Sequence, residues 1–228
     1  MKRFGFVRVA AAVPSVKVAD CMTNAASIVG LAKKAENEGV QIVCFPELSV
    51  TAYTCADLFA SQLLISKAEE ALRFILRETE NLNVNIIAGL PVVAGNSLYN
   101  CAVIMQHGVI NAIVPKTHLP SYNEFYETRW FASAIDATRQ SIDYAGQRNI
   151  PFGTDIIISC GEFVACREVE DDVAAGERLA AAWRYRSPEV LANLGREAEL
   201  AARYYDVGAE RYVALSGIVD ALSCGVDG

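Results

Sequence analysis

The residues with the clearest chemical potential are a lysine and a glutamate that each follow an apolar run. Lys116 comes directly after the run that ends at Pro115, and aromatic and carboxylate side chains follow it as far as Glu127. Glu47 stands just after another apolar run, which ends in Phe45-Pro46. A carboxylate can move a proton and a lysine can stabilise an oxyanion, so the two residue types together suit chemistry at a carbonyl carbon.

Each of these residues also has an ordinary structural interpretation. A Pro-Glu pair after a strand often begins a helix, where the helix dipole favours the Glu47 carboxylate. A lone lysine after a strand, such as Lys116, is usually a solvated edge residue, and Tyr122 and Tyr126 could belong to the hydrophobic core. The order and spacing of the whole set, rather than any one residue, favours the functional interpretation.

The composition favours a small molecule as the partner. The chain has 228 residues, 53% of them hydrophobic and 21% charged, which is enough for a large core in one domain or in one domain with an appendage. The net charge of −7 and the lack of any Lys/Arg cluster argue against binding to nucleic acid or to an anionic membrane surface. No run of about 18 apolar residues occurs, so we expect no membrane span.

The cysteines predict reduced thiols rather than a disulfide framework. They are odd in number and include no CxxC pair, so we expect neither disulfides nor a metal site. Most should be buried thiols of a cytoplasmic protein. The basic start and the apolar residues 4–13 could indicate an export signal, but Arg8 interrupts them and their alternation fits a first strand better. The seven cysteines are Cys21, Cys44, Cys55, Cys101, Cys160, Cys166 and Cys224.

Hydrophobic periodicity alternates between helix-like and strand-like segments. Helical spacing of apolar residues predicts helices over 20–38 and 56–81. A β-α-β-α opening followed by a β-meander predicts a mixed sheet with helices packed on one face. Candidate turn residues between the apolar runs, which are typical of hairpins, are Gly89, Gly95-Asn96 and His107-Gly108. The expected strands are residues 4–12, 41–45, 84–91, 97–106 and 109–114.

The composition changes near residue 165. From Val173 onward the chain has no lysine, threonine, phenylalanine or histidine and is rich in Ala, Arg, Glu and Gly. We therefore divide the chain into residues 1–172 and a mostly helical tail, residues 173–228. Within the tail we expect helices at 174–186 and 195–205. The tail could be a second small module, a diverged continuation of the same sheet, or foreign sequence joined by a coding error.

Five segments carry a resemblance to a known family. They resemble the amino-terminal glutaminase domain of glutamine-dependent NAD+ synthetase, a nitrilase-superfamily or carbon–nitrogen hydrolase module, from about Phe4 to Phe163. The most specific part is the lysine segment with its Tyr-x-Glu-Phe-x-Glu continuation, which ordinary nitrilases lack. The five segments are residues 45–49, 51–59, 115–122, 124–127 and 151–155.

The resemblance implies a fold, a reaction and a role for each matching residue. The fold is a nitrilase-like α-β-β-α sandwich that releases ammonia from glutamine for a synthetase domain, which adenylates and amidates deamido-NAD+ with ATP and Mg2+. Glu47 is implied to be the general base, Lys116 to stabilise the oxyanion and Glu127 to orient the lysine. Tyr53 and Tyr122 are implied to line the glutamine pocket. The amidase portion is expected to need no cofactor.

The sequence departs from the family at the nucleophile. Where the family has the cysteine of a strand-to-helix elbow, ungapped alignment places Glu170. A glutamate cannot replace the thiolate in this chemistry, so we expect impaired glutaminase activity. Cys166 lies four residues upstream and could share a strand face with that position, but about 13 Å of strand separates the two. A buried structural thiol is the favoured interpretation of Cys166.

Two accounts of the chain after about residue 164 stay open, a diverged continuation of the domain and foreign sequence that replaces it. Residues 190–194 resemble a downstream strand of the family. Leu215-Ser216-Gly217 with Asp220 resembles the phosphate loop of ATP pyrophosphatases, but Ile218 takes the place of the second glycine and crowds the backbone. We therefore expect no working synthetase site for ATP and Mg2+ in these residues.

Three hypotheses of function follow from these observations. The first is the glutamine-hydrolysing portion of an NAD+ synthetase, with glutamine as substrate and with impaired activity. The second is a catalytically silent scaffold of nitrilase fold that binds a carboxamide or a partner subunit. The third is a free-standing carbon–nitrogen hydrolase that uses Cys166. Because a helical tail would leave apolar faces of the first half uncovered, we also expect a homo-oligomer.

Overall fold

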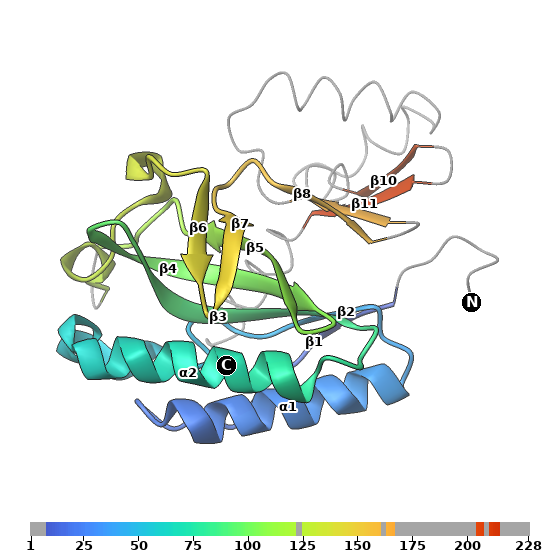
Figure 1. The fold of residues 1–228 in the computed structure, drawn as a ribbon, viewed down its shortest axis with the longest axis horizontal. Coiled ribbons are helices and arrows are strands. Elements are labelled where there is room, and N and C mark those ends of the chain that lie inside the picture. Colours follow the sequence, from blue (N-terminus) through green and yellow to red (C-terminus); the bar gives the residue numbers. More distant parts are fainter. Residues whose placement is uncertain (1–7, 122–124, 161–162, 167–203, 208–209, 215–228) are drawn as a thin grey trace. The chain divides into compact units, whose positions relative to one another are not determined.

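The computed structural model describes residues 8–121, 125–160, 163–166, 204–207 and 210–214. The described chain divides into two units, one that ends at Thr154 and one that begins at Asp155, and each unit is described by itself. Figure 1 labels most of the helices and strands of both.

The first unit is built on a five-stranded mixed sheet in the order β1-β2-β3-β4-β5. The first three strands run parallel, whereas β4 runs antiparallel to both of its neighbours. Helices α1 (Cys21–Asn37) and α2 (Gln62–Glu78) lie along one face of the sheet (Figure 1). The expected fold class, helices packed on one face of a mixed sheet, is confirmed. The strands are β1 (Val9–Ala11), β2 (Ile42–Cys44), β3 (Asn85–Ala94), β4 (Ser97–Gln106) and β5 (Val109–Pro115).

Local sequence signals explain most element boundaries in this unit. The Asp20 side chain caps α1 by accepting a hydrogen bond from the backbone N–H of Thr23 at 3.2 Å. Two glycine-containing turns join β3 to β4 and β4 to β5, and Gly95, His107 and Gly108 have positive φ there. Such backbone angles match the twist of adjacent antiparallel strands. The predicted strand 97–106 is confirmed at both ends.

Two predictions of local structure in the first unit are wrong. The helix expected from residue 56 begins at Gln62, because the preceding residues form a 3₁₀ helix, η2 (Tyr53–Ala60), in which Ala56 has φ 49° and ψ −132°. Gly89, expected to punctuate a hairpin, lies inside β3. Apolar spacing alone does not reveal an irregular backbone. The helical spacing of apolar residues continues through η2, so it predicts a helix that begins too early.

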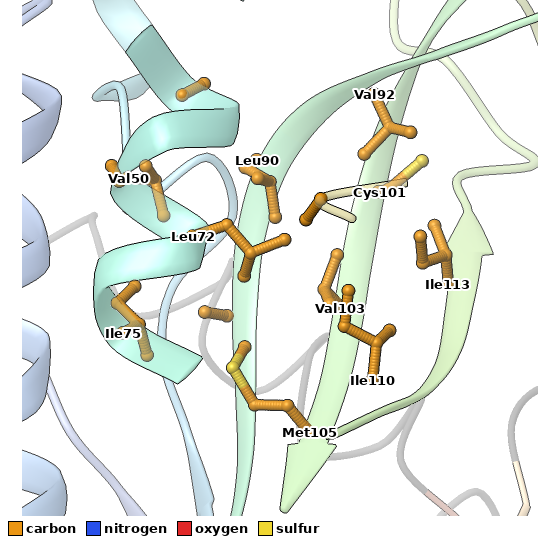
Figure 2. Packing of buried hydrophobic residues seen from close by; sticks show 14 of the residues in the cluster. Val50, Leu72, Ile75, Leu90, Val92, Cys101, Val103, Met105, Ile110 and Ile113 are labelled. Carbon is orange, nitrogen blue, oxygen red and sulfur yellow. The ribbon is translucent and has the colours of Figure 1, made fainter. Parts of the chain in front are cut away.

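The core of the first unit lies between the sheet and the two helices. Leu72 of α2 points towards Leu90 of β3 (Figure 2), and Ile75 of α2 and Val103 of β4 belong to the same buried cluster. Each of these side chains has no exposed surface. Burial of a side chain of this size contributes roughly 1.5–3 kcal/mol. Strand β3 is buried at nine of its ten residues, as expected for a strand with both faces covered.

A hairpin and two short 3₁₀ helices complete the first unit. Strands β6 (Ser141–Tyr144) and β7 (Gln147–Pro151) pair antiparallel, and Phe152 bridges to Ile113 of β5. The short helices are η3 (Glu127–Arg129) and η4 (Ala134–Asp136). In the part of the chain that the structure describes, no helix is long and apolar enough to cross a membrane.

The second unit contains a four-stranded sheet in the order β10-β11-β9-β8. Strand β9 pairs antiparallel with β8 and parallel with β11, and β11 pairs antiparallel with β10. The helix expected over 195–205 is wrong at its end, because Tyr204 and Tyr205 belong to β10. The helix expected over 174–186 lies outside the described residues. The strands are β8 (Ile157–Cys160), β9 (Phe163–Cys166), β10 (Tyr204–Val207) and β11 (Glu210–Ala214).

Candidate active site

Glu47 is held in a tight turn just beyond the end of β2. The turn is fixed by backbone hydrogen bonds from Thr51 and Ala52 to the Leu48 carbonyl oxygen, at 3.0 and 2.8 Å. Leu48 has φ 50°, a left-handed conformation that is costly for a residue with a side chain. Its side chain is fully buried, which holds this backbone conformation in place. The turn does not begin a helix, so the ordinary interpretation of Glu47 is wrong.

Gly89 of β3 gives this turn the room it needs. A Cβ atom at position 89 would lie 2.3 Å from the Leu48 backbone nitrogen, 2.8 Å from the Pro46 carbonyl oxygen and 2.9 Å from the Glu47 carbonyl carbon. All three are backbone atoms, which cannot rotate aside. The Gly89 carbonyl oxygen also accepts a hydrogen bond from the Val50 N–H at 3.1 Å. Only glycine allows the chain that carries Glu47 to lie against β3.

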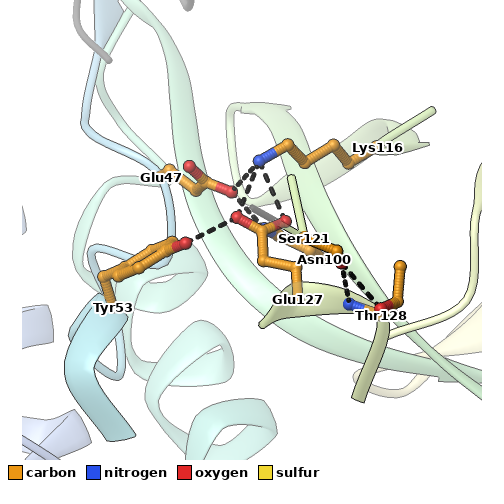
Figure 3. A network of polar contacts seen from close by, with 7 residues as sticks. All are labelled: Glu47, Tyr53, Asn100, Lys116, Ser121, Glu127 and Thr128. Atoms are coloured by element: carbon orange, nitrogen blue, oxygen red, sulfur yellow. Dashed lines mark hydrogen bonds and ion pairs between the residues drawn. The ribbon is translucent and has the colours of Figure 1, made fainter. Parts of the chain in front are cut away.

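Lys116 lies directly after β5, and its side chain reaches Glu47 and Glu127. Its Nζ donates to Glu47 Oε1 at 2.7 Å and to Glu127 Oε1 and Oε2 at 2.9 and 3.0 Å (Figure 3). The lysine side chain is 26% exposed, so it is not a solvated edge residue. Because β2 and β5 run in the same direction, Glu47 and Lys116 follow strands that end at the same edge of the sheet. Ligand sites are common at this edge of α/β sheets.

Glu127, at the start of η3, anchors the other side of the lysine. Its side chain is 1% exposed, and besides the two bonds from Lys116 it accepts one from the Tyr53 hydroxyl at 2.7 Å. Both carboxylate oxygens therefore have hydrogen-bond partners. Tyr53 points its hydroxyl at Glu127 (Figure 3), and its ring contacts Phe125 edge to face with centroids 6.4 Å apart.

Two carboxylates share one ammonium group in this cluster, which explains its electrostatics. Burial, followed by the charge of Glu47, raises the pKa of Glu127 above its usual value, although Lys116 and Tyr53 oppose this shift. Burial alone would lower the pKa of Lys116, but the charges and hydrogen bonds of the two carboxylates outweigh it and raise that pKa. The lysine is therefore a permanent cation at neutral pH.

The hydrogen bonds distinguish the two carboxylates. Glu47 accepts bonds from Lys116 Nζ and from the Asn100 side-chain amide, and both reach Oε1 (Figure 3). Among the described residues nothing bonds to Glu47 Oε2. Glu47 is 22% exposed, compared with 1% for Glu127. Glu47 can therefore exchange a proton with a bound molecule, whereas Glu127 is suited to holding the lysine in place.

Asn100 is a member of the cluster that sequence reasoning missed. It lies in β4, is 3% exposed and donates its amide hydrogen to Glu47. Its backbone carbonyl oxygen accepts the N–H of Lys116 at 2.8 Å. The available signal was an asparagine inside an otherwise apolar strand, since a buried amide needs a partner.

Three residues from the sequence-based predictions stay outside this geometry. Tyr122 and Glu170 lie outside the described residues, and Cys166 belongs to β9 of the second unit. Within the first unit the thiols are buried, and burial raises the pKa of Cys21 to about 11 and that of Cys44 to about 12. Such thiols carry little thiolate at neutral pH and are poor nucleophiles. No group of acidic, histidine and cysteine residues in the described part of the chain could hold a metal ion.

A cleft of about 530 Å³ adjoins the charged cluster of Glu47, Lys116 and Glu127 at Tyr53. On its surface Asp57 accepts hydrogen bonds from Arg129 at 2.7 and 3.0 Å and from the Trp130 indole at 2.9 Å. These bonds lower the pKa of Asp57 to about 2. Tyr53 lines the cleft and also bonds to Glu127, so it joins this cleft to the charged cluster. The cleft is lined by Tyr53, Thr54, Ala56, Asp57, Tyr126, Arg129 and Trp130.

A family model described as carbon-nitrogen hydrolase matches residues 8–170. A glutamine-dependent NAD(+) synthetase of Mycobacterium tuberculosis H37Rv is 33% identical over 193 residues, which is 83% of this chain and 28% of the relative. The protein of that name from Xylella fastidiosa Temecula1 is 28% identical over 219 residues, which is 95% of this chain and 39% of the relative. The chain thus spans well under half the length of these relatives.

Solved structures agree on the fold. The crystal structure of a glutamine-dependent NAD(+) synthetase from Cytophaga hutchinsonii superposes with a TM-score of 0.66 and 26% identity, over 75% of this chain and 29% of that chain. A double mutant of an amidase from Nesterenkonia sp. AN1, in complex with acrylamide, superposes with a TM-score of 0.53 over 93% of this chain and 77% of that chain. At 17% identity the second likeness concerns the fold alone.

Proposed function

This chain belongs to the carbon–nitrogen hydrolase family, and from that premise we propose that its charged cluster is built to hydrolyse the side-chain amide of glutamine with the help of a thiol. One observation carries the proposal. Lys116 Nζ lies 2.7 Å from Glu47 Oε1 and 2.9 Å from Glu127 Oε1, although the three residues come from separate segments of the chain. A base with a free oxygen, a fixed cation and a buried anchor are the groups that amide cleavage by a thiol requires.

The relatives support glutamine as the substrate. Both relatives described above carry the name glutamine-dependent NAD(+) synthetase. We assign to this chain the part of such a protein that releases ammonia. The ATP-dependent amidation of deamido-NAD+, with its ATP and Mg2+, is assigned to the remaining length of these relatives, which this chain does not span.

Each group of the cluster has a defined task in this reaction. Glu47 Oε2 takes the proton of a thiol, and the thiolate attacks the amide carbon to form a tetrahedral oxyanion. Lys116 turns one N–H from a carboxylate to that oxyanion, since its three N–H groups are all engaged in this structure. The C–N bond then breaks, Glu47 gives its proton to the departing nitrogen, and water cleaves the resulting thioester.

This chain is proposed to perform that reaction poorly, because it lacks the thiol at the required position. Ungapped alignment places Glu170 where the family has its cysteine. The thiols of Cys21, Cys44 and Cys55 are buried with raised pKa values and make no hydrogen bond to the cluster. We therefore expect the chain to bind glutamine without releasing much ammonia.

We further propose that residues 173–228 continue the domain in diverged form. The Xylella fastidiosa relative aligns with 95% of this chain, which must include most of these residues. Strand β11 also pairs parallel with β9 and antiparallel with β10, so the tail adds two strands to the sheet that contains β9.

Labelling with the glutamine analogue diazo-oxo-norleucine tests the proposal. The reagent alkylates an activated thiolate, and peptide mapping by mass spectrometry identifies the modified residue. We expect no labelled cysteine in the chain itself and a labelled thiol at position 170 in Glu170→Cys. Labelling at Cys166 in the unaltered chain would instead support a free-standing hydrolase that uses that thiol. A Glu170→Cys variant that resists the reagent would contradict the proposed glutamine site.

A further inference from the structure

We propose that Asn100 is a positioning residue that fixes the Glu47 carboxylate with Oε2 directed away from the lysine and available to a bound molecule. The inference rests on the proposed function, in which Glu47 acts as the base. It concerns a residue of β4 that shares no sequence segment with Glu47, Lys116 or Glu127.

The contacts of Asn100 reach both catalytic groups from one rigid strand. Its side-chain amide donates to Glu47 Oε1, and its carbonyl oxygen accepts the backbone N–H of Lys116 at 2.8 Å. Strand β4 pairs with β3 over nine residues and with β5 over six, so Asn100 lies in the interior of the sheet. Groups built on paired strands hold their positions better than groups on loops. Asn100 therefore fixes the separation between the turn that carries Glu47 and the end of β5 that carries Lys116.

The chemical type of Asn100 suits this task. Lys116 alone could pair with both oxygens of Glu47, because an ammonium group imposes no planar geometry on a carboxylate. A second donor on Oε1 satisfies that oxygen and leaves Oε2 free. The donor is neutral, so it adds no charge to a cluster in which one ammonium already serves two carboxylates. A cationic donor at position 100 would hold Glu47 ionised and weaken it as a base.

Replacing Asn100 with aspartate separates positioning from packing. Asn100→Asp keeps the shape of the side chain but exchanges the amide donor for an acceptor that repels Glu47. When that new carboxyl is protonated it can donate again, so the defect should lessen as pH falls. Asn85→Asp is the matched control, because Asn85 is also buried, at 5% exposure, in the neighbouring strand β3. Asn85 lies about 20 Å along the sheet from Asn100, and it does not contact Glu47, Lys116 or Glu127.

Two measurements test the proposal, and the first needs no activity. Crystal structures of the unaltered chain, Asn100→Asp and Asn85→Asp should show the Glu47 carboxylate rotated in Asn100→Asp alone. An unmoved Glu47 carboxylate in Asn100→Asp would overturn the proposal. This result stands whether or not the chain acts on glutamine.

The second measurement follows alkylation of the Glu170→Cys variant by diazo-oxo-norleucine. Adding Asn100→Asp should slow labelling about 10- to 100-fold near neutral pH, since a misplaced base loses much of the general-base contribution. The ratio of its rate to that of Glu170→Cys should rise as pH is lowered from about 8 to about 5, as the new carboxyl takes up a proton. Adding Asn85→Asp should change the rate less than about twofold. Equal slowing by Asn100→Asp and Asn85→Asp would show a merely structural effect and would overturn the role given to Asn100. Failure of Glu170→Cys itself to react would contradict the proposed function. The crystal structures would then decide the role of Asn100.

Discussion

Lys116 Nζ lies 2.9 and 3.0 Å from the two carboxylate oxygens of Glu127, a side chain that is only 1% exposed. This pairing places a permanent cation at the site without leaving it mobile. It also makes Glu127 a structural requirement, because an ammonium held below the surface needs a nearby negative charge.

Glu127→Gln should be strongly destabilising. The change keeps the shape of the side chain but leaves Lys116 with Glu47 as its only anionic partner. Breaking a buried ion pair from one side costs about 3–5 kcal/mol, and the partial exposure of Lys116 places the expected loss near the lower figure. Urea unfolding monitored by circular dichroism measures the change. Glu70→Gln, which removes an exposed ion pair with Lys67, is the control and should cost under about 0.5 kcal/mol.

Tyr53→Phe should weaken the same anchor by a smaller amount. The change removes the hydroxyl that donates to Glu127 Oε1 at 2.7 Å but keeps the ring that contacts Phe125. A hydrogen bond to a charged group contributes about 1.5–3 kcal/mol, so the free energy of unfolding should fall by that order. Tyr126→Phe alters a side chain that is 59% exposed and should be close to neutral. Similar unfolding curves for the two variants would contradict the role given to the Tyr53 hydroxyl.

Gly89→Ala should displace the turn that carries Glu47. The added methyl group would lie 2.3 Å from the Leu48 nitrogen, so the backbone must move. Overpacking of this kind costs about 1–3 kcal/mol, and here it also moves the proposed base. Gly30→Ala offers the opposite result, since a methyl group on α1 meets no heavy atom within 4 Å and improves helix propensity by about 1 kcal/mol. Equal stability of the two variants would show that the close approach at Gly89 is not required.

The contribution of Glu36 to stability should depend on pH. Although burial opposes the shift, hydrogen bonds from Asn83 and Val84 lower the pKa of Glu36 below its ordinary 4.5. A carboxyl with a lowered folded-state pKa stabilises the fold above its unfolded-state pKa and loses that effect as pH falls through the folded-state value. Glu36→Gln should therefore cost about 1 kcal/mol at pH 7, a value reduced for solvent exposure, and less at a pH well below the ordinary pKa of 4.5. Urea unfolding at both pH values checks this, and a cost independent of pH would contradict it.

Much of the first unit could be predicted from sequence because its signals are local. Strand β4 was predicted to the residue, since an apolar run lies between two turns that contain glycine. The segments around Glu47 and Lys116 were likewise identifiable, because each follows a strand directly. The helical pattern failed at η2, where the positive φ of Ala56 interrupts a sequence that has helical spacing.

The rest depended on contacts between distant segments. The sequence indicates Gly89 only as a turn residue. The need for glycine becomes evident only in the fold, where the backbone of residues 46–48 lies against β3. Asn100 was overlooked because its partner, Glu47, is 53 residues away in sequence. The hydrogen bond from the Tyr53 hydroxyl to Glu127 was not predicted, because the two residues are 74 positions apart in sequence. Sequence spacing identifies which groups are present, but long-range packing decides which of them meet.

Ammonia release from glutamine tests the central claim most directly, namely that the site is complete except for its thiol. The unaltered chain should release ammonia at the uncatalysed rate, and Glu170→Cys should exceed it clearly. Adding Glu47→Gln to Glu170→Cys should lower the rate at least about 100-fold, because the general base is removed. Catalysed ammonia release by the unaltered chain, or no gain on Glu170→Cys, would contradict the account.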